Sequence, residues 1–160
     1  MRVGDRRGNV GHESKNPYYE RRKYREPTIC PRCSLVYHNG HWIASNQNPK
    51  GAYRELCPAC RREMDRYPGG IVRLEGNYLM KKKEEILSIA RNREKQTRVH
   101  RPLQRIMWVE TEGEAIEIYT TSDHLAMSIG KSINHAQGGE LTFKGLSGDK
   151  FIRVYWRRDE

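Results

Sequence analysis

The stretch that decides the fold runs from Cys30 to Cys60 and reads CPRCSLVYHNGHWIASNQNPKGAYRELCPAC. It holds all four cysteines of the chain, as two C-P-x-C clips on either side of residues 34–56. Two residues between cysteines let one tight turn aim both sulfur atoms at the same point, and the proline fixes φ for that turn. Two such clips supply the four thiolates of a tetrahedral zinc ion. The spacing therefore predicts a structural Zn²⁺ site with the ligands Cys30, Cys33, Cys57 and Cys60.

Other uses of the cysteines fit the sequence less well. A thioredoxin-like redox site has one C-x-x-C at a strand-to-helix junction, whereas this chain has two clips around a polar loop. A catalytic zinc ion keeps an open position and uses His or carboxylate ligands, and four cysteines close the shell. His38 and His41 lie in the loop and can in principle replace a cysteine. We interpret them instead as exposed residues that contact phosphate.

The composition points to a polyanionic partner. The 160 residues include 30 Lys and Arg against 20 Asp and Glu, for a formal charge of +10. Such an excess favours nucleic acid ahead of a membrane surface, with plain solubility as the alternative. The chain has no apolar run of the roughly 18 residues that a membrane span needs, and the N-terminus lacks the apolar segment of a secretory signal. We expect a cytoplasmic protein with no membrane partner.

Residues 1–27 are rich in Arg, Gly, Asn and Glu and show no helical or strand periodicity. This composition predicts a flexible tail, because it cannot bury enough surface to offset the entropy of ordering. The run YYERRKYREP alternates tyrosine with basic residues, so it can pair guanidinium groups with phosphate and stack phenols on unpaired bases. An ordinary solvated tail is the alternative.

An α+β domain is expected over residues 69–160, after the zinc module at residues 28–68. Strands are expected at 71–76, 103–110, 115–121, 140–146 and 151–158, and helices at 77–98 and 121–139. Thr121 or Ser122 can cap the second helix, and its apolar stripe includes Leu125 and Ile129. The order β-α-β-β-α-β-β matches a ferredoxin-like sandwich of two helices and four or five strands.

We find no catalytic set in the sequence. Ser122, Asp123 and His124 are adjacent at a helix start, where they point in different directions and act as ordinary caps. No nucleophile elbow and no Walker loop is present. The last strand alternates core residues with Arg153, Tyr155 and Arg157, and that polar face is a further candidate for contact with RNA. We expect a protein that is not an enzyme and has no small-molecule substrate.

The chain resembles a family of poorly characterised small bacterial proteins. The resemblance lies in CPRCSLVYHNGHW, LCPACRREMDRYPGGIVRLEGNYL, HRPLQRIMW and TTSDHLAMSIGKSI, and it extends over residues 28–157. Its first part also resembles the zinc-binding region of the adaptor that accompanies the large ribosomal subunit during nuclear export. The resemblance implies zinc on the four cysteines and an association with the ribosome or RNA, and it implies no catalysis. The other domains of the adaptor have no counterpart here.

The sequence therefore predicts a zinc-ribbon protein that binds structured RNA, most plausibly rRNA on the ribosome, with a role in translation, hibernation or assembly. A zinc-dependent protein–protein adaptor without RNA binding is the alternative. A DNA-binding regulator is less favoured, because no helix-turn-helix pattern occurs. The expected RNA contacts are Arg6, Arg7, Tyr18, Tyr19, Arg21, Arg22, Lys23, Tyr24, Arg25, Arg32, His38, His41, Trp42, Arg54, Arg61 and Arg62.

Overall fold

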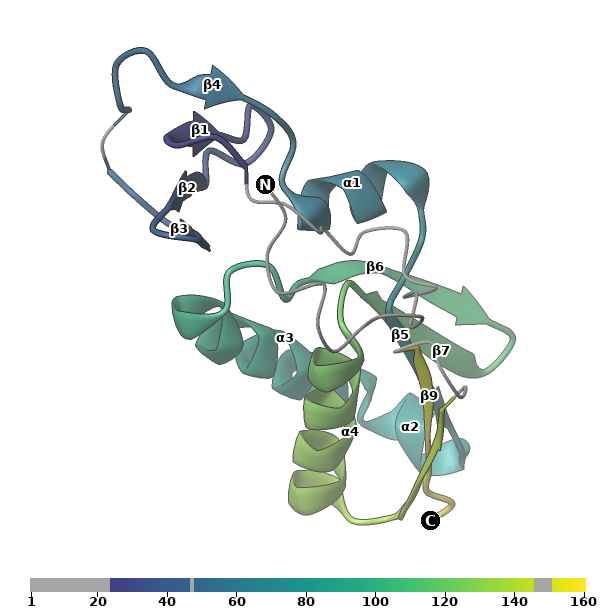
Figure 1. Ribbon diagram of the computed structural model, residues 1–160. Coiled ribbons are helices and arrows are strands. Elements are labelled where there is room, and N and C mark those ends of the chain that lie inside the picture. Colours follow the sequence, from purple (N-terminus) through teal and green to yellow (C-terminus); the bar gives the residue numbers. More distant parts are fainter. Residues whose placement is uncertain (1–23, 47, 146–150) are drawn as a thin grey trace, which may run out of the picture. The chain divides into compact units, whose positions relative to one another are not determined.

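The computed structural model describes residues 24–46, 48–145 and 151–160 (Figure 1). The chain divides after Asp65 into two compact units. Among the described helices, none is both long enough and apolar enough to cross a membrane.

The first unit is a small zinc-ribbon-like module with a four-stranded sheet in the order β3-β2-β1-β4. Its strands are β1 (Thr28–Ile29), β2 (Val36–His38), β3 (His41–Ile43) and β4 (Tyr53–Arg54), and the helix α1 (Pro58–Asp65) follows them. Strands β2 and β3 form a hairpin around Asn39 and Gly40, which both have positive φ. Asn-Gly is the strongest two-residue hairpin signal. The hairpin therefore fills part of the loop between the clips.

The second unit carries a five-stranded sheet in the order β6-β7-β5-β9-β8. Its elements are β5 (Gly70–Glu75), α2 (Asn77–Lys81), α3 (Lys83–His100), β6 (Ile106–Glu112), β7 (Ala115–Thr120), α4 (Asp123–Gln137), β8 (Glu140–Gly145) and β9 (Ile152–Arg157). The strands and helices follow the expected order, except that two helices, α2 and α3, stand where one was predicted; the first predicted strand, β5, is the central one.

The sheet departs from a ferredoxin-like one in the place of its last strand. Strand β9 lies between β5 and β8 and pairs parallel with β5, with Val72 opposite Val154. Strand β8 pairs antiparallel with β9 and forms the sheet edge. A four-stranded ferredoxin-like sheet would put β8 beside β5, so the additional strand is inserted in the sheet instead of being added at its edge.

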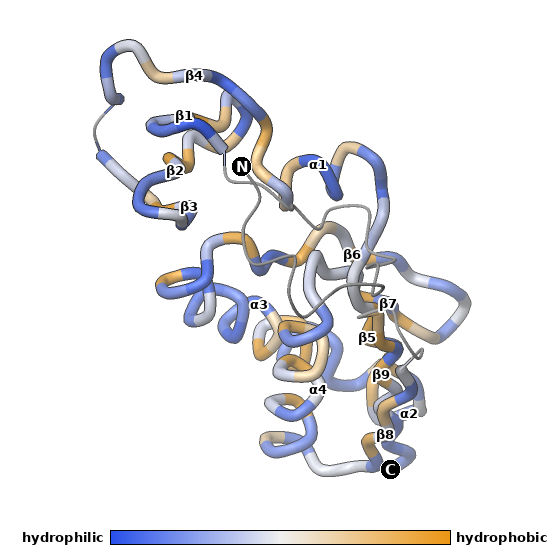
Figure 2. The backbone as a smooth tube through the Cα atoms, in the orientation of Figure 1, coloured by the Kyte–Doolittle hydropathy of each residue, from blue (hydrophilic) through white to orange (hydrophobic). Residues whose placement is uncertain are grey.

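The core of this unit lies between the sheet and helices α3 and α4. Inward-facing residues of the strands meet the apolar stripes of both helices, and Figure 2 shows hydrophobic residues along β5 and β9 and hydrophilic ones along much of α3. Ser122 caps α4 as expected, because its Oγ accepts hydrogen bonds from the backbone N–H groups of His124 and Leu125. Trp156 is 1% exposed, and its indole N–H donates to the carbonyl of Gly138 at 2.8 Å.

The helix predicted over residues 77–98 is two helices, separated at Lys82, whose φ is −121° and ψ 25°. The short helix α2 is tied to the end of the chain, because Tyr78 N–H donates to the carbonyl of Arg158 and Asn77 N–H to Asp159. The long helix α3 packs on α4 instead. The two helices thus have different packing partners, which the uninterrupted sequence pattern did not reveal.

Candidate metal centre and charged surfaces

The first clip forms a tight turn directly after β1. The N–H of Cys30 donates to the carbonyl of Leu35, and the N–H of Ser34 donates to the carbonyl of Cys30, both at 2.8 Å. Ser34 takes a positive φ of 70°, which completes the turn. Cys30 is fully buried and Cys33 is partly exposed, so the turn presents one sulfur from inside the module and one from nearer its surface.

The second clip opens helix α1. Pro58 is the first helical residue, a position where its missing N–H has no helical partner to lose. The Sγ of Cys57 accepts a hydrogen bond from the N–H of Cys60 at 3.4 Å, so the sulfur caps the helix. The positive end of a helix dipole favours thiolate over thiol at this position. Helix formation and ligand geometry therefore support each other at this clip.

The four sulfur atoms form a compact cluster. All lie within 4.8 Å of one another, and the Sγ atoms of Cys33 and Cys57 are 3.8 Å apart. A disulfide would bring two sulfurs to about 2.0 Å, whereas thiolates about 2.3 Å from a central tetrahedral ion are about 3.8 Å apart. None of the four cysteines forms a disulfide. The cluster thus has the dimensions and donor set of a closed four-thiolate metal site.

Hydrogen bonds within the cluster favour the thiolate form of Cys30. Burial by itself raises the pKa of Cys30, but the backbone N–H groups of Cys57, Cys33 and Arg32, together with the Cys33 thiol, lower it to about 7. The N–H of Cys57 donates to the Cys30 sulfur at 3.3 Å. A thiol that loses its proton near neutral pH is ready to bind a metal ion.

Besides the cysteine cluster, the zinc-ribbon-like module contains a cluster of three aromatic side chains, those of Tyr24, Tyr37 and Trp42. The three ring centroids are 4.9 to 5.3 Å apart in tilted or edge-to-face arrangements. Trp42 is 7% exposed, so its ring packs inside the module and has no free face for a base. Tyr24 belongs to this cluster although it was expected in the tail.

Several of the expected RNA contacts already have partners within the module. Arg25 lies 3.9 Å above the ring of Tyr53, and Arg32 pairs with Glu63 at 2.5 Å. Arg61 donates to the Tyr24 hydroxyl at 3.5 Å. His38, His41 and Arg54 are exposed on the strands, and Arg62 is partly buried in α1. Outside the described residues lie Arg6, Arg7, Tyr18, Tyr19, Arg21, Arg22 and Lys23.

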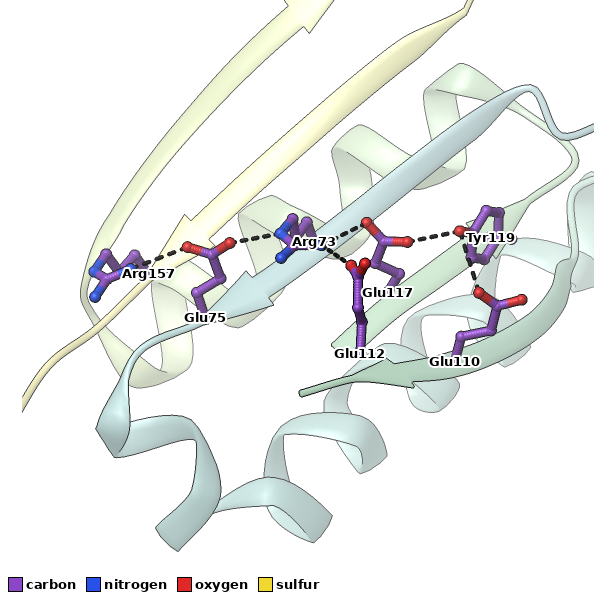
Figure 3. Close-up of polar contacts among 7 residues, drawn as sticks. All are labelled: Arg73, Glu75, Glu110, Glu112, Glu117, Tyr119 and Arg157. Atoms are coloured by element: carbon purple, nitrogen blue, oxygen red, sulfur yellow. Dashed lines mark hydrogen bonds and ion pairs between the residues drawn. The ribbon is translucent and has the colours of Figure 1, made fainter. Parts of the chain in front are cut away.

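The sheet face that the helices leave open carries a polar network instead of a basic surface (Figure 3). Arg73 at its centre binds three carboxylates, those of Glu75 at 2.5 Å, Glu112 at 2.7 Å and Glu117 at 2.8 Å. Together these hydrogen bonds raise the pKa of the guanidinium group above its ordinary value, those from Glu112 and Glu75 contributing most. On the half of this face formed by β5 and β7, carboxylates therefore predominate, and they are paired with Arg73.

The network continues to both sides. Arg157 on β9 binds Glu75 and Asp159, both at 3.0 Å. Tyr119 donates to Glu117 at 2.6 Å, and its ring stacks on Trp108 at 4.6 Å. Burial, followed by the charges and hydrogen bonds of Glu117 and Glu110, raises the pKa of Tyr119. The predicted RNA-facing residue Arg157 is therefore already engaged by carboxylates.

Sequence reasoning missed the most basic surface of the second unit, which lies on the C-terminal half of α3. Residues 90–101 hold five Lys and Arg against Glu94, while the rest of residues 66–160 holds 12 positive and 12 negative side chains. Arg91, Lys95 and Arg98 are exposed and line a groove between α3 and β6. The i, i+4, i+7 spacing of these three residues in the sequence indicates that they share one helix face. The groove itself depends on the position of β6 beside this face, which the sequence does not show.

No protein-family model, no curated protein and no solved structure matches the chain. The described residues thus support a zinc-ribbon-like four-cysteine site in an α+β chain. Membership of the bacterial family and kinship with the export adaptor remain predictions from the sequence.

Proposed function

We propose that this chain is a zinc-stabilised, non-enzymatic RNA-binding protein that acts on the ribosome. The observation that carries the proposal is the concentration of charge on the C-terminal half of α3 and on Arg101 directly after it, because residues 90–101 account for the whole positive excess of residues 66–160. A surface of this kind attracts phosphate, and a charge that served only solubility would not need to be gathered on one helix.

Zinc is the metal that best suits the four cysteines. Thiolate ligands select zinc, copper(I) or iron, and a closed set of four thiolates in two clips is typical of structural zinc. Such an ion would hold the two clips together and leave no position for water or substrate. Its role in the proposal is to maintain the module, and no chemical step passes through it.

The net charge of the module suggests that its role is structural and that the RNA contacts lie elsewhere in the chain. Residues 24–65 hold six Lys and Arg against four Asp and Glu. A divalent ion with four thiolates adds a net charge of about −2, which cancels this small excess. The metal-loaded module is therefore close to neutral, and the polyanion partner is expected to contact α3 and the basic residues that precede Tyr24.

Co-sedimentation with ribosomes through a salt series tests the proposal. The full chain is compared with one that begins at Tyr24, because Tyr24 packs in the module and a longer deletion would disturb it. We expect pelleting at low salt that weakens steeply as salt rises, since released counterions dominate such binding. If neither chain pellets at low salt, the ribosome is not the partner.

Nuclease treatment separates the proposal from the adaptor alternative. An RNA-binding protein loses its association when the RNA is digested. An adaptor that binds a protein keeps its association after digestion, and its binding changes little with salt. Binding that survives both treatments would favour the adaptor.

A further inference from the structure

The groove between α3 and β6 has a basic wall and a largely apolar wall. Arg91, Lys95 and Arg98 line it from the helix. The strand contributes Ile106, Met107, Trp108 and Val109. Strand β6 forms the edge of its sheet (Figure 1), and the groove runs along this edge strand.

The cations of the helical wall are available for a ligand. In the described part of the chain, Arg91 and Lys95 make no ion pair, and Arg98 has a loose contact of 3.8 Å with Glu94. Glu94 is itself directed at the strand, since it accepts a hydrogen bond from the N–H of Ile106 at 2.7 Å. Glu94 therefore offsets one of the three positive charges that line the groove and leaves its net charge positive.

The spacing of these cations suits consecutive phosphates. Residues 91 and 98 are separated by about 10 Å along the helix axis, at about 1.5 Å per residue. A stacked nucleic-acid strand has one phosphate per about 3.4 Å, so this length of helix faces about three phosphates of one strand.

A stack of planar groups stands at the rim of the groove. The rings of Tyr119 and Trp108 are 4.6 Å apart and almost parallel, with an angle of 16° between them. The guanidinium carbon of Arg66 lies 3.9 Å from the Trp108 ring centre, and the Arg66 side chain is 64% exposed. Bases stack on aromatic rings and on guanidinium planes alike. A base can therefore extend this stack at Arg66.

We propose that the α3–β6 groove binds an unpaired segment of RNA, with phosphates on Arg91, Lys95 and Arg98 and a base stacked on Arg66, which itself lies over the Trp108 ring. This inference rests on the proposed RNA-binding function and names its site and the form of RNA it takes. The acidic network around Arg73 excludes the neighbouring half of the open sheet face as the site for a phosphate backbone.

The test measures binding of a short labelled single-stranded RNA by fluorescence anisotropy at several salt concentrations, with the zinc-loaded full chain. The groove variant is R91Q/K95Q/R98Q. Its matched control, K81Q/K82Q/K83Q, removes three positive charges at the junction of α2 and α3, which do not line the groove. Loss of three phosphate contacts on a single strand should lower the slope of log K against log salt by about 2 and weaken binding at 0.1 M salt about 30- to 100-fold. The control should keep the wild-type slope.

A second variant tests the stack. Arg66→Lys keeps the charge and removes the planar group, so we expect weaker binding, by about fivefold, with an unchanged salt slope. Wild-type affinity in Arg66→Lys would contradict stacking at this residue.

Two competitors test the class of ligand. A duplex of the same sequence should bind at least about tenfold more weakly than the single strand, because its bases are not free to stack. A glutamate-rich peptide of equal charge should not displace the RNA at the same concentration. Equal binding of the duplex, or displacement by the peptide, would overturn the inference.

The outcomes separate this inference from the proposed function. If the wild-type chain binds no RNA, the proposed function fails and the inference fails with it. If the wild-type chain binds RNA and the groove variant binds equally well, only the inference fails. Circular dichroism and zinc content establish that each variant is folded before its affinity is compared.

Discussion

The two units of this chain are built on different principles. The first has strands of two or three residues, and its buried positions include three cysteines and the rings of Tyr37 and Trp42. The second buries fifteen apolar residues between a five-stranded sheet and two long helices. A core of that size sustains a fold by apolar burial, whereas a small module needs an additional constraint such as a metal. From this difference we expect the stability of the first unit to depend on a metal bound by its cysteines and that of the second on its apolar packing.

Metal removal should have the largest effect on the difference in stability between the two units. Chelation, or the substitution Cys57→Ser, is expected to unfold residues 24–65, because a structural zinc ion contributes about 10–16 kcal/mol in small domains. Amide signals in a two-dimensional NMR spectrum report on each unit separately, and those of residues 66–160 should persist as the internal control. Retention of dispersed signals for the module after complete metal removal would contradict a metal-held fold.

A cavity in the core of the second unit should destabilise that unit and leave the metal site of the first unit unchanged. Ile118→Ala truncates a fully buried side chain and should lower the free energy of unfolding of this unit by about 2–5 kcal/mol, while the metal content stays at one ion per chain. Denaturant unfolding and metal analysis measure the two effects. Val99→Ala is the control, since Val99 is 73% exposed and its truncation should change stability by less than about 0.5 kcal/mol.

The helix cap at Ser122 gives a smaller effect. Ser122→Ala removes an acceptor for the N–H groups of His124 and Leu125 and should cost about 1 kcal/mol in the unfolding free energy of the second unit. Ser88→Ala, an exposed position inside α3, is the matched control and should be neutral or slightly stabilising. Equal losses in both variants would show that the cap contributes nothing specific.

The smallest expected effect is the pH dependence of the open sheet face. Burial raises the pKa of Glu117, but the hydrogen bonds from the Tyr119 hydroxyl and Arg73 outweigh it and hold the pKa below its ordinary value. A carboxyl with a lowered pKa stabilises the fold above its unfolded-state pKa, and that contribution disappears as the pH falls through the folded-state pKa.

Glu117→Gln should therefore reduce the loss of stability of the second unit between pH 5 and pH 3, by up to about 1 kcal/mol. Urea unfolding across this range measures the difference. Glu114→Gln, at an exposed carboxylate outside this network, is the control for the removal of one negative charge. Identical profiles for Glu117→Gln and the wild type would contradict the role of the network.

Local patterns in the sequence predicted the features that depend on neighbouring residues. The two clips placed the four cysteines together, and Ser122 marked the start of α4. The place of β9 between β5 and β8 could not be predicted, because strand order depends on contacts between residues far apart in the chain. The same limit applies to Trp42, which was expected to contact RNA and is buried by Tyr24 and Tyr37.

The candidate RNA site depended most on the tertiary structure. Arg91, Lys95 and Arg98 are separated by intervals that place them on one helix face, but a charged helix face is usually only solvated. The edge strand β6 and the stack at Trp108 give that face a second wall, and neither could be placed beside α3 from the sequence.

The most direct test of the division between a metal-held module and an RNA-contacting unit is the affinity for short single-stranded RNA before and after zinc removal. The measurement uses the full chain, with the loss of zinc and the unfolding of the module recorded on the same sample. The account predicts that the affinity changes by less than about twofold, because the contacts on α3 and β6 are retained. A loss of more than about tenfold on zinc removal would place the RNA contacts in the module and contradict the account.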